Sequence, residues 1–159
     1  MSRLDSFIRR VTAQRDILDH ISEEVAGMDG PVIELGLGNG RTFDHLRERL
    51  PGRRIIAFDR ALAAHRTSTP DPEDLVIGEI AETASGMAGI DAALVHADIG
   101  TGYAEKDAAT LTWLPDLTAR LLRPGGIAVS GLPLEHADLA PQPLPASVSQ
   151  DRYFLYRRK

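Results

Sequence analysis

The segment from Val32 to Thr42, Val-Ile-Glu-Leu-Gly-Leu-Gly-Asn-Gly-Arg-Thr, constrains the fold more than any other part of the chain. It begins as a short apolar strand and continues into three glycines that alternate with other residues at positions 36, 38 and 40. Glycine is needed where a strand turns sharply into a helix, and where the backbone must approach a ligand with no Cβ atom in the way. The segment therefore predicts a strand, a tight turn and a helix, with a ligand held against the turn.

The spacing of these glycines argues against two common phosphate-binding turns. The dinucleotide fingerprint Gly-x-Gly-x-x-Gly needs its third glycine at position 41, where this chain has Arg41. The turn has no lysine and no Gly-x-x-x-x-Gly-Lys-Ser/Thr pattern, and the carboxylate of Glu34 would repel phosphate oxygens. A cationic or polyhydroxylated ligand suits the turn better than a pyrophosphate, which disfavours an NAD-dependent oxidoreductase.

The length and composition predict one domain with one sizeable core. The chain has 159 residues, of which 43% are hydrophobic. We expect a single domain over residues 1–159, made of an N-terminal helix within 1–30, a ligand-binding core over 31–131, and an irregular segment with a last strand over 132–159.

The charge balance and the missing cysteines exclude several classes of partner. A net charge of -5 argues against a surface that neutralises nucleic-acid phosphates, and no stretch interleaves basic with aromatic residues. Without cysteine there are no disulfides and no cysteine-ligated zinc, and the five histidines show no metal-binding spacing. No segment resembles a signal sequence or a membrane span, so we expect a cytoplasmic protein with no metal, no nucleic acid and no membrane partner.

Short apolar strands alternate with helical segments along most of the chain. The predicted helices cover residues 3–26, 41–50, 81–88 and 104–122, the last with a kink or break at Pro115, and the predicted strands cover residues 32–35, 54–58, 75–77, 92–97, 127–130 and 151–158. The alternation predicts an α/β fold with a doubly wound, mostly parallel sheet. Only one clear strand follows residue 131, so we expect the sheet to be shortened at its C-terminal end.

The residues at the carboxyl ends of the predicted strands are polar. In open α/β sheets ligands bind at these ends. The residues in question are Glu34, Asp59, Glu79, His96 and Asp98. Asp59 follows Gly40 by nineteen residues, a spacing at which an acidic side chain accepts hydrogen bonds from ribose hydroxyls. The pattern therefore favours a nucleoside ligand.

With these motifs the chain resembles a class I, Rossmann-like S-adenosylmethionine-dependent methyltransferase of the small single-domain bacterial type. The resemblance covers residues 32–131 and rests on four motifs: Glu34-Leu-Gly-Leu-Gly-Asn-Gly40, Asp59 at the end of Ile-Ile-Ala-Phe-Asp, Asp91-Ala-Ala-Leu-Val-His-Ala-Asp98, and Leu121-Leu-Arg-Pro-Gly-Gly-Ile-Ala-Val129. It implies that S-adenosyl-L-methionine is the cofactor.

The resemblance also implies roles for individual residues. Gly36, Gly38 and Gly40 would let the backbone pass close to the methionine part of the cofactor, and Glu34 would lie near its amino group. Asp59 would hold the ribose, and Asp98 would lie beside the methionine end and the acceptor. The other residues expected to bind the cofactor are Leu37, Arg41, Thr42, Arg60, Glu79 and Ile80, the last two at the adenine.

His96 and Asp98 are the candidates for a catalytic base. Residues two apart in a strand point the same way, and a histidine beside a carboxylate can take up a proton near neutral pH. A histidine within a buried strand is also compatible with a hydrogen-bonded core residue. Both interpretations of His96 stay open at this stage.

The expected activity is methyl transfer to an N or O atom of a small-molecule acceptor, which requires chiefly the alignment of donor and acceptor. The alternative is a non-catalytic S-adenosylmethionine-binding module with a regulatory or sensing role. The shortened sheet would leave an edge that proteins often pair or shield, so we also expect a homo-oligomer. The N-terminal helix or a neighbouring subunit would then cover the acceptor pocket.

Overall fold

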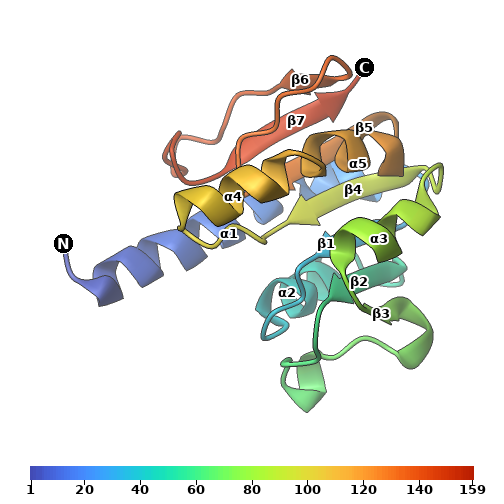
Figure 1. The fold of residues 1–159 in the computed structure, drawn as a ribbon, viewed down its shortest axis with the longest axis horizontal. Coiled ribbons are helices and arrows are strands. Elements are labelled where there is room, and N and C mark those ends of the chain that lie inside the picture. Colours follow the sequence, from blue (N-terminus) through green and yellow to red (C-terminus); the bar gives the residue numbers. More distant parts are fainter.

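The computed structural model describes residues 1–159 as one seven-stranded sheet with helices on both faces (Figure 1). The strands lie in the order β3-β2-β1-β4-β5-β7-β6. Their bounds are Val32–Leu35 for β1, Ile55–Asp59 for β2, Leu75–Ile77 for β3, Ala92–Ala97 for β4, Leu122–Ser130 for β5, Leu139–Pro141 for β6 and Phe154–Arg158 for β7. β3, β2, β1, β4 and β5 are parallel, and β7 runs antiparallel to β5 and β6. The predicted doubly wound, mostly parallel α/β fold is confirmed.

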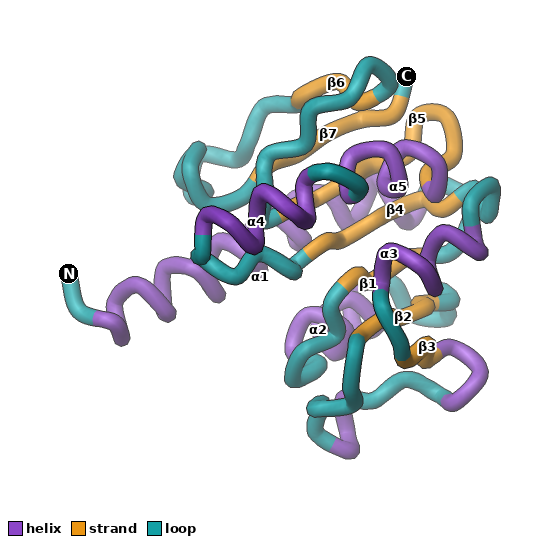
Figure 2. Tube along the Cα trace, in the orientation of Figure 1, coloured by secondary structure: helices purple, strands orange, loops and turns teal.

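The helices pack in two groups against this sheet. α1 and α2 cover one face, and α3 and α5 cover the other, with α4 leading into α5 (Figure 1). The bounds are Arg3–Ala26 for α1, Arg41–Arg49 for α2, Ile80–Thr83 for α3, Ala104–Leu111 for α4 and Leu114–Leu121 for α5. The connection from β2 to β3 is a long loop with only short 3-10 turns at Arg66–Ser68 and Pro72–Asp74, a segment in which the sequence predicted no helix (Figure 2).

α1 is the longest element, and its two halves have different surroundings. A capping box starts it, because the Ser2 hydroxyl accepts from the Asp5 N–H and the Asp5 carboxylate accepts from the Ser2 N–H. From Ala13 onward its apolar stripe is buried against the sheet, whereas its first turns are largely exposed and extend past the carboxyl ends of the parallel strands (Figure 1). The Arg53 guanidinium donates to the Met28 and Gly30 carbonyl oxygens just past the end of the helix.

The central strands β1 and β4 are buried along their whole lengths, because helices cover both sides of the sheet. Val32 in β1 and Leu94 in β4 belong to the core under α1 and α2, whereas Ile33 and Val95 belong to the core under α3 and α5. Since side chains alternate along a strand, Glu34 and His96 point toward α1 and α2. The parallel register places these two residues side by side.

One expectation about the second half of the chain needs correction. The sheet ends in two antiparallel strands rather than one, because β6 lies beside β7 at the edge. β6 has three residues and ends in Pro141, which cannot donate to a ladder, so it left almost no pattern in the sequence. The helical segment over 104–122 is interrupted near Pro115, as expected: it forms α4 and α5, and the ring of Pro115 is accommodated in the first turn of α5. None of the helices combines the length and apolar character that crossing a membrane requires.

Candidate functional site

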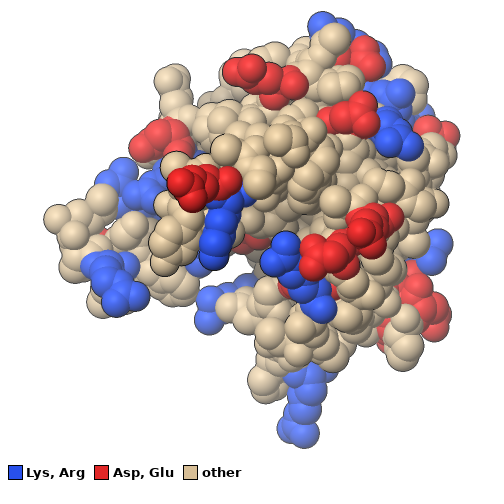
Figure 3. All heavy atoms as spheres, viewed as in Figure 1, with Lys and Arg blue, Asp and Glu red and all other residues tan.

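Two adjoining cavities lie at the carboxyl ends of the parallel strands. The larger, of about 650 Å³, lies between the glycine turn, the start of α3, and α4. The smaller, of about 170 Å³, lies between the glycine turn, α1 and the start of α2. Gly36, Gly38 and Asp98 line both, so the cavities meet at these residues. In the space-filling view the surface is hollowed below α4, and acidic and basic side chains gather along the hollow (Figure 3).

Glycine occupies the three positions of the turn for different structural reasons. All three have positive φ angles, 90° at Gly36, 54° at Gly38 and 83° at Gly40. A Cβ atom at Gly36 would stand 2.6 Å from the Ile99 side chain, and one at Gly40 would overlap the Ser68 carbonyl oxygen. At Gly38 a Cβ atom would meet no protein atom within 4 Å. Packing therefore requires glycine at 36 and 40, whereas Gly38 leaves room for a ligand.

Asp59 ends β2 at the wall of the larger cavity and is held in one orientation. Its Oδ2 accepts from the Gly38 N–H at 2.8 Å, and its Oδ1 accepts from the Arg60 N–H at 2.7 Å. A carboxylate has about four acceptor positions, so these bonds leave capacity for two more donors. The Arg60 guanidinium pairs with Glu79 at 3.2 Å beside this carboxylate. Asp59 can therefore accept hydrogen bonds from a diol.

Glu34 is fully buried and lines neither cavity. One of its oxygens accepts from the Thr42 hydroxyl in the first turn of α2, and the other lies 2.9 Å from His96 Nδ1. Both oxygens are engaged within the protein. The resemblance implied that Glu34 lies near the amino group of the cofactor. In the structure Glu34 is instead a buried link that fixes the glycine turn between β1, β4 and α2.

His96 is the buried partner of Glu34. Burial alone would lower the pKa of His96, but the neighbouring Glu34 carboxylate outweighs it and the pKa is raised. The ring stacks on Tyr153 with centroids 6.4 Å apart, and its Nε2 has no hydrogen-bond partner. Because His96 lines neither cavity, the core interpretation of this residue fits its position better than that of a base acting on an acceptor.

Asp98 follows β4 and lies where the two cavities meet. Gln14 of α1 donates to Asp98 Oδ2 at 2.6 Å, and the Tyr153 hydroxyl donates to Oδ1 at 3.1 Å. The Arg10 guanidinium lies 3.6 Å from Oδ2. Burial and the charge of Asp98 raise the pKa of Tyr153, so its phenol keeps the proton that it donates. These contacts fix the Asp98 carboxylate at the junction of the two cavities.

The remaining residues expected to bind a cofactor are divided between the two cavities. Arg60, Glu79 and Ile80 line the larger one, and Leu37, Arg41 and Thr42 line the smaller one. The Leu37 side chain is buried in the core under α1 and α2, and Thr42 is engaged with Glu34.

The partners of Asp98 were not found by sequence reasoning, although one signal existed. Gln14 is a polar residue in the apolar stripe of α1, between Val11 and Leu18, and is almost completely buried. A polar side chain at such a position needs a hydrogen-bond partner. Arg10 and Tyr153 gave no comparable signal, because an arginine on a helix and a tyrosine in a predicted strand are common.

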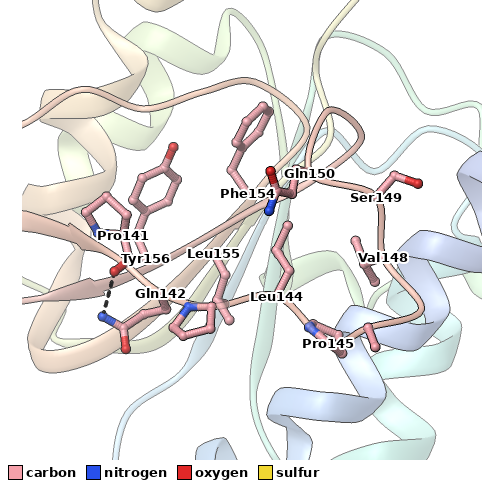
Figure 4. Close-up of a pocket in the computed structure, with 12 residues that line it drawn as sticks. Pro141, Gln142, Leu144, Pro145, Val148, Ser149, Gln150, Phe154, Leu155 and Tyr156 are labelled. Atoms are coloured by element: carbon pink, nitrogen blue, oxygen red, sulfur yellow. Dashed lines mark hydrogen bonds between the residues drawn. The ribbon is translucent and has the colours of Figure 1, made fainter.

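A third depression of about 580 Å³ lies between the loop over residues 142–150 and β7 (Figure 4). Its wall consists largely of proline, leucine and amide side chains, and it has no charged residue. None of the residues that the sequence singled out lines it. The candidate site is therefore formed by the two cavities around Asp98.

A family model described as S-adenosyl-L-methionine methyltransferase matches residues 1–158. The chain belongs to this family of S-adenosyl-L-methionine methyltransferases. The expected cofactor, S-adenosyl-L-methionine, is thereby confirmed. A comparison with curated proteins gives no match.

Solved structures agree with this assignment. An S-adenosyl-L-methionine methyl transferase from Silicibacter pomeroyi DSS-3 is 42% identical over 100% of this chain and 99% of its own, with a TM-score of 0.92. Cofactor-bound Rv0187 from MTB is 14% identical over 98% of this chain and 88% of its own, with a TM-score of 0.65. SAH-bound PaMTH1 from Podospora anserina is 16% identical over 100% of this chain and 80% of its own, with a TM-score of 0.61. The last two share the fold.

The residues around the cavities fit this cofactor. The open space at Gly38 accepts a ligand against the backbone, and Asp59 has acceptor capacity for ribose hydroxyls. Ile80 and Trp113 give the larger cavity apolar surface for a base, and Asp98 puts a negative charge where the cavities meet.

Proposed function

We propose that the protein transfers a methyl group from S-adenosyl-L-methionine to an N or O atom of a small-molecule acceptor. The observation that carries the proposal is the position of Asp98, a carboxylate fixed by two hydrogen bonds at the junction of a large and a small cavity. The larger cavity suits an adenosyl group, with the ribose at Asp59 and the adenine beside Glu79 and Ile80. The methionine part would pass Gly38 into the smaller cavity.

S-adenosyl-L-methionine supplies an electrophilic methyl group on a sulfonium. The protein's residues bind and align the two reactants. Asp98 provides a negative charge that attracts the cationic end of the cofactor. Gly38 allows the approach to the backbone, and Asp59 fixes the ribose, so the reacting carbon is held at one place.

Removal of a proton from the acceptor contributes less to this mechanism than the alignment of the two reactants. Both oxygens of Asp98 already accept hydrogen bonds, and His96 does not reach a cavity. The site therefore suits an acceptor atom that is already a free nucleophile, such as a neutral amine or an ionised oxygen.

The alternative of a non-catalytic sensing module supposed that the acceptor site was lost together with missing tail strands. Both β6 and β7 are present in the sheet, so this supposed loss has no counterpart in the fold. We therefore favour an enzyme with a small-molecule acceptor, without nucleic-acid or membrane partners, working in the cytoplasm.

We also retain homo-oligomerisation as a proposal. The exposed first turns of α1 support it, since Leu4 is 66% and Ile8 is 50% exposed. Light scattering at micromolar concentration should give the mass of more than one chain. A monomeric mass would remove this part of the proposal.

The experiment for the activity has a binding step and a transfer step. Calorimetry with S-adenosylhomocysteine, the demethylated product, should show binding to the wild type. Transfer of a labelled methyl group should then be measured on a panel of amines, phenols and acids. Asp98→Asn should lower the transfer rate at least about tenfold, because the fixed negative charge is lost. Asp116→Asn, an exposed change on α5, is the matched control. Binding without transfer to any compound would favour the sensing module instead.

A further inference from the structure

His96 and Glu34 form a buried pair that the mechanism above does not use. Both side chains are fully buried, and His96 Nδ1 lies 2.9 Å from Glu34 Oε2. Burial disfavours a charged ring, but the charge of Glu34 outweighs it and raises the pKa of His96, which favours an ion pair. Apolar side chains of similar volume are often as stabilising as a buried ion pair, or more so. The stability of the core alone therefore does not account for this pair.

A second feature of His96 also lowers stability. Its Nε2 atom is buried and has no hydrogen-bond partner. A buried polar atom without a partner costs free energy that an apolar side chain would avoid. The other residues of β4 are all alanine, leucine or valine, so His96 is the one polar residue of this strand. The position of His96 in the fold suggests what this cost supports.

On one side, the contacts of His96 lead to the wall of the smaller cavity. The second oxygen of Glu34 accepts from the Thr42 hydroxyl in the first turn of α2. Thr42 lines the smaller cavity, in which the function proposed above places the methionine part of the cofactor. Glu34 and His96 are direct neighbours on paired strands. The pair therefore ties the start of α2 to the two central strands beside this cavity.

On the other side, the contacts of His96 lead to Asp98. The rings of His96 and Tyr153 are nearly parallel, at 16°, with centroids 6.4 Å apart. Stacked rings at such a distance attract each other. The Tyr153 hydroxyl donates to Asp98 Oδ1 at 3.1 Å, and Asp98 lines the smaller cavity as well. The ring of His96 therefore supports the tyrosine that holds this carboxylate.

The two residues at the ends of these contacts belong to different elements. Thr42 lies at the start of α2 and Asp98 follows β4, yet both line one cavity of about 170 Å³. Side chains that hold a ligand in a space of this size must be fixed to within about 0.5 Å by the residues behind them. His96 lies between the two sets of contacts, so it is placed to fix both residues at once.

Resting on the function proposed above, we propose that His96 is a positioning residue for the methionine part of S-adenosyl-L-methionine. It holds one wall of the smaller cavity through Glu34 and Thr42. It holds a second wall through Tyr153 and Asp98. His96 itself touches neither the cofactor nor the acceptor, because it lines neither cavity.

The first test replaces the buried pair by two apolar side chains, Glu34→Val together with His96→Leu, here called the apolar-pair variant. Its Tm should lie within about 5 °C of the wild type, because no buried charge is left unpaired. Its affinity for S-adenosylhomocysteine, measured by calorimetry well below both Tm values, should fall at least about tenfold, since Thr42 and Tyr153 lose their support.

Adenosine separates loss of position from general damage to the fold. It lacks the methionine part, so it tests the larger cavity alone. Ligand-observed NMR should show that the apolar-pair variant binds adenosine within about twofold of the wild type. A distortion of the whole site would weaken adenosine and S-adenosylhomocysteine alike.

Glu34→Gln is the conservative variant. A glutamine can accept from Thr42 with its oxygen and donate to a neutral His96 with its amide nitrogen, so both hydrogen bonds are retained. Its affinity for S-adenosylhomocysteine should therefore stay within about threefold of the wild type.

The second test removes a single hydroxyl and keeps the ring. Tyr153→Phe retains the stack on His96 but frees Asp98 Oδ1, and it should weaken binding of S-adenosylhomocysteine at least about threefold. Tyr156→Phe is the matched control. The Tyr156 hydroxyl accepts from the Leu134 N–H on the other face of the sheet and lines neither cavity, so this variant should bind as the wild type does.

Several results would overturn the proposal. An apolar-pair variant that binds S-adenosylhomocysteine as the wild type does, or that fails to fold, would assign the pair to the stability of the core. An equal loss for adenosine would point to general damage. A Glu34→Gln variant as weak as the apolar-pair variant, or a Tyr153→Phe variant of unchanged affinity, would contradict positioning through these contacts. Failure of the wild type to bind S-adenosylhomocysteine would instead contradict the function proposed above, and this proposal with it.

Discussion

Replacing Gly38 by alanine should weaken ligand binding strongly while lowering the stability of the fold only slightly. The new methyl group would meet no protein atom within 4 Å and would project where the two cavities meet. The backbone N–H that donates to Asp59 is retained, so this hydrogen bond is not the cause of any loss. The expected effect is therefore a steric conflict with the cofactor alone.

The loss of folding stability follows from the left-handed backbone conformation of Gly38, which has a φ of 54°. An alanine in the left-handed region costs about 1–2 kcal/mol, and the reduced freedom of the unfolded chain offsets about 0.4–1 kcal/mol of this. The net loss is about 1 kcal/mol, or roughly 2–4 °C in Tm for a chain of this size. Cofactor affinity should fall at least about tenfold, which corresponds to about 1.4 kcal/mol.

Gly52 offers the matched control. It has a φ of 77° and open space around a Cβ atom, but it lies in the turn after α2 and lines neither cavity. Gly52→Ala should therefore lose the same few degrees in Tm and bind S-adenosylhomocysteine as the wild type does. Thermal unfolding and calorimetry measure both quantities. Equal affinity of the Gly38→Ala and Gly52→Ala variants would refute the reasoning.

Three further predictions concern side chains of the site. Asp59→Asn should weaken S-adenosylhomocysteine binding about tenfold or more, because a charged acceptor of the ribose hydroxyls is lost; calorimetry that gives an unchanged Kd would contradict this. Glu34→Leu should cost about 3–5 kcal/mol of unfolding free energy, since it leaves His96 buried without its partner, and urea unfolding measures the loss. Because the pKa of His96 is raised in the folded state, the stabilisation from this pair is fully present below a pH of about 6.5 and is lost as the pH rises through the folded-state pKa. The difference in urea midpoint between the wild type and Glu34→Leu should therefore narrow at alkaline pH, and a constant difference would be inconsistent with a charged His96.

The parts of the fold with strong local patterns were predictable from the sequence. β1, β3 and β4 begin and end at the predicted residues, because each is an apolar run bounded by glycine or acidic residues. β6 was missed, since three residues that end in proline carry no periodicity. The early start of β5, at Leu122 rather than residue 127, was hidden because its Arg-Pro-Gly-Gly stretch is typical of a turn.

The site was predictable only where strand ends dictate position. Asp59 and Asp98 lie at cavity walls, as expected from residues at the carboxyl ends of parallel strands. Glu34 occupies an equivalent position in sequence but turns into the core, because His96 on the neighbouring strand and Thr42 on α2 bind both of its oxygens. Such pairings depend on the register between strands, which spacing along the chain does not report.

The anchoring of Asp98 depends on two segments that lie far apart in the sequence, α1 and the residue before β7. Gln14 belongs to the first helix and Tyr153 directly precedes the last strand, yet each holds one oxygen of the same carboxylate. During synthesis on the ribosome, β1, β2 and β4 can assemble well before residue 153 leaves the exit tunnel. A nascent chain in that condition would possess the glycine turn without a finished binding site, so competence for the cofactor should arrive only after Tyr153 has joined the fold.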